Sequence, residues 1–176
     1  MKLFKVFLSF FLIIGLFFGI SLFFPHQYKF EKSIDINKSR SEVFGYMNNL
    51  KNWEQWSVWN KSLDTSMYIF YSARKDSIGA MQYFNGNLLG SGRFRISNIK
   101  ANEFLSYNLQ MHQSEVNANG TFFFNDKNNM TQLIWIDSGD VGFNPIYRYM
   151  IPSKRSSTEA AFDEGLKRIK LSIESK

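Results

Sequence analysis

Residues 156–175 read SSTEAAFDEGLKRIKLSIES, and this stretch decides the fold class. Its large apolar residues recur at i, i+4, i+7 and i+11, which places them in one stripe along a helix. The residues of the stripe are Phe162, Leu166, Ile169 and Ile173. Ser156 and Glu159 have the spacing of a capping box, so we expect the helix to begin there. A helix with one apolar stripe has to bury it against another layer.

The sequence before this helix predicts that layer as an antiparallel sheet. Short segments rich in aromatic and β-branched residues alternate with turn signals such as Gly86-Asn87. The predicted strands are residues 28–36, 66–73, 80–85, 90–100, 104–111, 118–125 and 130–137. Residues 139–154, which contain two prolines, are predicted to form a loop. We therefore expect an α+β fold in which a curved antiparallel sheet of about seven strands wraps the long C-terminal helix.

Two short helical segments are expected between the first two strands. Ser39 and Glu42 form a capping box ahead of an apolar stripe that includes Val43 and Met47. Three tryptophans then follow at a spacing of three, which places them on one side of a helical turn. These are Trp53, Trp56 and Trp59. They could line the mouth of a pocket or close one end of the core.

The composition limits the chemistry that the chain can perform. Aromatic residues make up 18% of the 176 residues, which is ample material for a core or a lined cavity. Cysteine is absent, and this excludes disulfides, thiolate metal sites and a cysteine nucleophile. The net charge of +6 comes from scattered Lys and Arg residues with acidic residues between them. We interpret this charge as solvation and expect no nucleic-acid partner.

The N-terminal segment predicts a membrane anchor. Residues 6–24 carry no charge and would span about 28 Å as a helix, close to the hydrocarbon thickness of a bilayer. The alternative is a cleaved signal peptide, but the bulky residues before Pro25 do not resemble a cleavage site. We expect a transmembrane anchor in residues 1–25, with membrane contact through residues 3–24, and one soluble domain in residues 26–176.

The side of the membrane is less strongly indicated. Lys2 and Lys5 favour an N-terminus inside the cell, whereas Lys29 and Lys32 pull in the opposite direction. Because large domains can translocate regardless of charge, we expect a single-pass cell membrane protein with its soluble domain outside the cytoplasm.

Several motifs, taken in order, resemble the polyketide cyclase/dehydrase group of the START-like SRPBCC superfamily. That group has a Val-Phe-x-Tyr/Phe motif followed by Trp-x-x-Trp-Ser-x-Trp. The matching segments here are residues 43–46 (VFGY), 53–59 (WEQWSVW), 90–96 (GSGRFRI), 131–135 (TQLIW) and 162–167 (FDEGLK). The resemblance covers about residues 28–172, and its specificity comes from the order of motifs that are individually weak.

The resemblance implies the helix-grip fold and an internal cavity for apolar or aromatic small molecules. It implies no shared reaction, and fold alone does not fix function. The candidate ligand-binding residues are aromatic side chains of the tryptophan motif and of the predicted strands. They are Trp53, Trp56, Trp59, Tyr83, Phe94, Tyr107 and Trp135.

No set of residues has the spacing of a catalytic or metal site. His112 has Glu115 three residues later, but the polar run between them reads as a turn at a strand end, so we expect an exposed histidine. Arg93 and Arg95 alternate with apolar residues and are expected to face solvent. No nucleophile elbow, phosphate-binding loop or metal-ligand spacing is present, and we expect no cofactor.

Three functional hypotheses follow. The leading one is a membrane-tethered, noncatalytic binding module for a lipid or another apolar small molecule. The second is an enzyme of cyclase or hydrolase type, which would need at least two polar groups converging inside the cavity. The third is a noncatalytic envelope interaction protein with a filled interior that works through its surface. The sequence identifies neither a ligand nor a protein partner.

Overall fold

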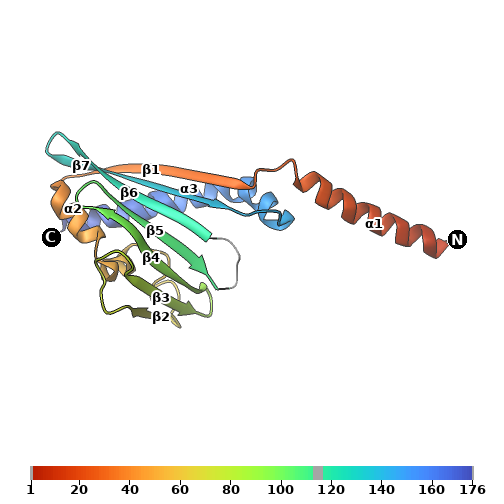
Figure 1. Ribbon diagram of the computed structural model, residues 1–176, viewed down its shortest axis with the longest axis horizontal. Coiled ribbons are helices and arrows are strands. Elements are labelled where there is room, and N and C mark those ends of the chain that lie inside the picture. The colour runs from red at the N-terminus through yellow and green to blue at the C-terminus, as the bar shows by residue number, and fades with distance from the viewer. Residues whose placement is uncertain (1, 113–116, 176) are drawn as a thin grey trace.

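A long helix runs along a seven-stranded sheet, and a second helix projects away from both (Figure 1). The computed structural model describes residues 2–112 and 117–175. Its helices are α1 (Lys2–Ser21), α2 (Arg40–Met47), the short 3₁₀ helix η1 (Leu50–Gln55) and α3 (Pro145–Glu174). Its strands are β1 (Gln27–Ile36), β2 (Tyr68–Tyr71), β3 (Met81–Gly86), β4 (Gly90–Lys100), β5 (Phe104–Met111), β6 (Asn117–Lys127) and β7 (Met130–Asp140).

The strands form one antiparallel sheet in the order β1-β7-β6-β5-β4-β3-β2. The first strand pairs with the last, so the chain returns to its start before entering α3. The hairpin between β6 and β7 turns on Asn128 and Asn129, both with positive φ, and is tighter than the four-residue turn expected from the sequence. The α+β helix-grip fold with a preceding apolar helix is confirmed.

The core lies between the inner face of the sheet and the helices. Alternate residues of β7 face inward, so Leu133 and Trp135 are buried while their neighbours are not. Trp135 packs on Phe162 of α3 with ring centroids 4.1 Å apart. Leu166 and Ile169 continue the predicted stripe of α3 into the core. The predicted helix α2 is also present, with the Ser39–Glu42 capping box formed.

The predicted loop at residues 139–154 is wrong, because α3 begins at Pro145. The Asn144 side chain accepts hydrogen bonds from the backbone N–H groups of Ile146 and Tyr147 and caps the helix. Pro145 occupies the first turn, where a missing N–H costs nothing. Pro152 lies inside the helix, which continues through it. The Ser156–Glu159 capping box therefore does not form, and Glu159 pairs with Arg155 instead.

Two glycines on the sheet lie directly beneath tyrosine rings. Gly120 of β6 is paired with Tyr107 of β5, and a Cβ built on Gly120 would lie 2.0 Å from that ring. Gly139 of β7 is paired with Tyr28 of β1 in the same way, with a closest approach of 2.5 Å. No side chain fits at such distances, so each tyrosine ring can occupy its position only because the paired residue is glycine.

Helix α1 precedes β1, projects away from the sheet and packs against the first part of α3 (Figure 1). The Tyr149 hydroxyl donates a hydrogen bond to the Phe17 carbonyl at 2.9 Å, and the two rings stack. The remainder of α1 is exposed apolar surface. It is long and apolar enough to cross a membrane, although a signal sequence would meet the same description.

Candidate ligand cavity

A cavity of about 610 Å³ lies between the sheet and α3. Its size lies within the range of small-molecule sites. The wall includes Tyr28 near the start of β1, Val141 just after β7, and Tyr147, Met150 and Ile151 in the first turns of α3. These residues belong to the end of the domain from which α1 leaves (Figure 1). The cavity therefore lies towards the apolar helix.

The structure brings five of the seven candidate residues to this cavity. Trp56 and Trp59 approach from the segment after η1, while the other three come from the inner face of the sheet. The five are Trp56, Trp59, Phe94, Tyr107 and Trp135. They belong to one cluster of ring contacts, for example between Trp56 and Trp135 at 5.3 Å and between Trp59 and Phe94 at 5.3 Å. Whether they bind a ligand stays a prediction.

Trp53 and Tyr83 are not brought to the cavity. Trp53 is 0% exposed and packs behind Trp56, with its indole N–H donating to the Met47 carbonyl at 2.8 Å. Tyr83 is 36% exposed on the outer face, because the phase of β3 turns its neighbours Gln82 and Phe84 inward. Tyr83 therefore faces away from the cavity, contrary to its inclusion among the candidate ligand-binding residues. Trp53 instead takes the alternative position considered for the tryptophans, as part of the core.

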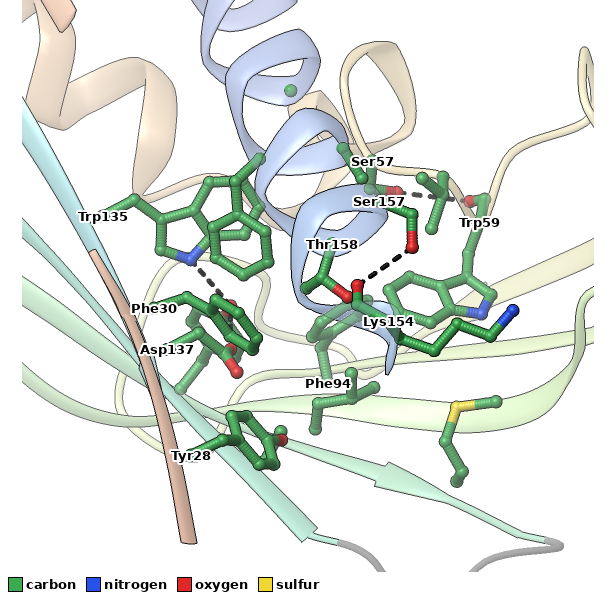
Figure 2. A pocket seen from close by; sticks show the side chains of 18 of the residues that line it. Tyr28, Phe30, Ser57, Trp59, Phe94, Trp135, Asp137, Lys154, Ser157 and Thr158 are labelled. Atoms are coloured by element: carbon green, nitrogen blue, oxygen red, sulfur yellow. Dashed lines mark hydrogen bonds between the residues drawn. The ribbon is translucent and has the colours of Figure 1, made fainter. Parts of the chain in front are cut away.

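A buried carboxyl group lies on the otherwise aromatic wall. Asp137 of β7 is only 7% exposed and lines the cavity among Tyr28, Phe30 and Trp135 (Figure 2). The Tyr107 hydroxyl donates to Asp137 Oδ2 at 3.0 Å, and Trp135 Nε1 donates to the same hydroxyl oxygen at 3.0 Å. An indole nitrogen can only donate, so the direction of this chain is fixed from Trp135 through Tyr107 to Asp137.

The position of Asp137 alters the acid–base properties of the wall. Burial raises the pKa of Asp137 to about 7, against the smaller lowering effect of the Tyr107 hydrogen bond. The pKa of Tyr107 is raised well above its usual value by burial and by the Asp137 charge. Burial and the same charge also raise the pKa of Tyr28. Near neutral pH the carboxyl group can thus be either charged or neutral, while both tyrosines keep their protons.

Sequence reasoning missed Asp137 although a usable signal was present. In β7 the side chains at 133, 135 and 137 share one face, so the phase that marks Leu133 and Trp135 as buried also turns Asp137 inward. Tyr28 and Phe30 could have been found from the same alternation in β1. The wall residues of α3 before Ser156 could not have been found in this way, because the sequence predicts a loop there.

The other polar residues considered from the sequence lie away from the cavity. His112 is exposed, and the polar run that follows it falls outside the described residues. Arg95 is exposed, and Arg93 donates to the Gln110 side chain on the outer face. Among residues 2–112 and 117–175, no three histidine or acidic side chains gather in a way that could hold a metal ion. Separately, the buried indole N–H of Trp56 has no hydrogen-bond acceptor among the described residues.

Comparison with known proteins agrees with this architecture at the level of fold. A protein of unknown function from Staphylococcus aureus, SA2116, shares 12% identity with a TM-score of 0.64, covering 85% of this chain and 96% of the other. A protein from Arthrobacter aurescens solved by NMR shares 13% identity with a TM-score of 0.61, covering 84% and 87%. Ara h 8.0201 shares 9% identity with a TM-score of 0.56, covering 85% and 99%.

These likenesses show that the chain shares its overall fold with these proteins. No family model matches the sequence, and no curated protein is similar to it. At such low identity the shared feature is the fold alone, so any activity has to be argued from the cavity itself.

Proposed function

We propose that this protein is a membrane-tethered binding module that holds an apolar small molecule or a lipid in the cavity beneath α3. The observation that carries the proposal is the cavity of about 610 Å³, walled by aromatic and aliphatic side chains with few polar groups. Open apolar volume loses packing contacts, and an apolar ligand restores them. A cavity of this size also favours binding over a role that uses only the surface.

The tether is α1, with Tyr149 joining it to the helix that covers the cavity. We propose that α1 remains in the membrane as a single span and that the domain lies outside the cytoplasm. This arrangement keeps the cavity-bearing end of the domain beside the bilayer, where apolar molecules are concentrated. The proposal draws its support from the length and hydropathy of α1 and from the position of the cavity near its end.

A second candidate function is acid–base catalysis on a bound apolar substrate. It is favoured by Asp137, because a carboxyl group with a pKa of about 7 suits proton transfer near neutral pH. It is less well supported, because the only hydrogen-bonding neighbour of Asp137 in the described residues is Tyr107, whose proton is already committed to it. Turnover would need another polar group supplied by the substrate.

The binding function is tested by asking what co-purifies with the full-length chain. Ala161 lies on the exposed surface of α3 and lines the cavity, whereas the adjacent Ala160 is exposed and does not line it. We expect native mass spectrometry to show a stoichiometric small molecule on the wild-type protein and on Ala160→Trp. Ala161→Trp should carry at least about tenfold less, because the indole occupies the ligand volume.

The matched pair separates occupancy of the cavity from a general effect of an added tryptophan. Equal occupancy in the two variants would show that the ligand binds at another part of the protein. If no molecule co-purifies and no added lipid is retained by any of the three proteins, the binding proposal is wrong.

A further inference from the structure

The Asp137 carboxyl group has one oxygen engaged and one available. Oδ2 accepts the Tyr107 hydrogen bond at 3.0 Å, and within the described part of the chain no side chain or backbone group donates to Oδ1. Because Tyr107 in turn accepts from Trp135, its proton cannot be redirected to a ligand without breaking two hydrogen bonds. The acceptor that this wall offers to a bound molecule is therefore Asp137 Oδ1.

Within residues 2–112 and 117–175, no cationic side chain pairs with this carboxylate. Lys154 lines the opposite side of the cavity and extends away from Asp137 (Figure 2). Arg148, on the same helix, donates to the Gly142 carbonyl and covers the Phe143 ring. Arg155 lies over the Phe30 ring but is paired with Glu159. On the sheet side, the titratable groups beside Asp137 are Tyr28 and Tyr107, and both are uncharged.

The surroundings of Asp137 are aromatic. Tyr28 and Phe30 lie with ring centroids 5.5 Å apart on β1, and Phe162 lies 5.9 Å from Phe30 and 4.1 Å from Trp135. The faces of such rings attract cations, and the attraction is greater where water is excluded. A buried carboxylate without a counter-ion, surrounded by aromatic rings, is complementary to an ammonium group.

We propose that the cavity selects amphiphiles whose polar end is a protonated amine, held by Asp137 Oδ1 among these rings with the apolar body filling the rest of the cavity. This inference rests on the proposed binding function and adds the chemical class of the ligand. A neutral alcohol offers a donor but no charge, and a carboxylate ligand would be repelled by Asp137.

The test compares three probes that share one alkyl chain: decylamine, decanol and decanoate. Their binding to the full-length protein in lipid nanodiscs is measured by equilibrium dialysis, with empty nanodiscs giving the background from partitioning into lipid. Asp137→Asn is the test variant. Asp163→Asn is the control, because it makes the same charge change on α3 at a residue that pairs with Lys32 and does not line the cavity.

We expect the wild-type protein and Asp163→Asn to bind decylamine about tenfold or more tightly than decanol at pH 8, and decanoate most weakly. From pH 8 to pH 6 decylamine affinity should fall about tenfold, because Asp137 gains a proton while the alkylammonium stays charged. In Asp137→Asn the preference for decylamine and its pH dependence should disappear, while decanol binding stays within about twofold.

Equal binding of decylamine and decanol to the wild-type protein overturns the inference, as does a preference for decanoate or an unchanged preference in Asp137→Asn. Each of those results still leaves the cavity as a binding site. If none of the three probes binds above the empty-nanodisc background, the proposed function falls together with the inference.

Discussion

At the scale of single residues, Asp137 makes the folded state sensitive to pH. Its pKa rises from 3.8 in the unfolded chain to about 7 in the folded protein. Between these two values the folded state holds a proton that the unfolded state has lost, so stability falls as the pH rises through this window. Above pH 7 the full cost applies, at most about 4 kcal/mol for a group this deeply buried.

Asp137→Asn should remove this pH-dependent cost. At about pH 3, below the pKa of Asp137 in both states, the carboxyl group is neutral like the amide in the folded and the unfolded chain, so we expect nearly equal stability of variant and wild type. At pH 8 the variant should be the more stable, by about 1–4 kcal/mol. Denaturant unfolding of the full chain at both pH values measures the difference, and a gap that does not change with pH would contradict the raised pKa.

Residues of the wall were predictable where one strand carried its own alternation. Phe94, Tyr107 and Trp135 were placed correctly on the inner face by this period of two. Tyr83 was not, because β3 is short and has aromatic residues in both phases: Phe84 and the polar Gln82 are buried, whereas Tyr83 faces outward. For Asp137 its polarity alone predicts exposure, whereas the alternation of β7 turns its side chain inward.

At the scale of elements, the two prolines of α3 occupy different environments. Pro145 lies in the first turn, whereas Pro152 lies in the interior and cannot donate to the carbonyl four residues before it. We expect Pro152→Ala to stabilise the protein by about 1–3 kcal/mol and to slow amide exchange in residues 146–151. Pro145→Ala should be near neutral or slightly destabilising.

Thermal unfolding and hydrogen exchange on the two variants measure this contrast. Equal effects of the two substitutions would mean that the surroundings, rather than the missing hydrogen bond, determine the cost of Pro152. The same contrast explains the error in the sequence prediction. Proline marks a helix end reliably only where tertiary packing does not hold the helix together around it. In α3 this packing is against β1, and it is not visible in the local sequence.

Most of the sheet was predictable at this scale because each hairpin is local. All seven strands were expected near their observed positions, and the antiparallel order follows from short connections. Pairing of β1 with β7 joins residues about a hundred positions apart, and no local strand pattern predicts it.

At the scale of the whole molecule, the proposed function requires α1 to hold the cavity beside a membrane. The helix is 20 residues long, about 30 Å, and strongly apolar. We expect the protein to keep its full 20.6 kDa mass and to stay in the membrane fraction after alkaline carbonate extraction. A shortened protein in the soluble fraction would show instead that α1 is a cleaved signal.

The side of the membrane on which the domain lies can be tested by labelling one introduced cysteine, because the chain has no cysteine of its own. Asn87 is exposed in the turn between β3 and β4, so Asn87→Cys provides a single reactive thiol. A maleimide that cannot cross membranes should label it in protoplasts. Labelling only after lysis would place the domain in the cytoplasm.

The tyrosine rings that lie on Gly120 and Gly139 also restrict the order in which this sheet can change over generations. A lineage can lose the Tyr107 ring first, since removal leaves space, and afterwards gain a side chain at position 120. The reverse order passes through an alanine whose Cβ would overlap the ring. In each pair the tyrosine can be replaced first, which leaves a void. The glycine cannot be replaced until the tyrosine has been lost.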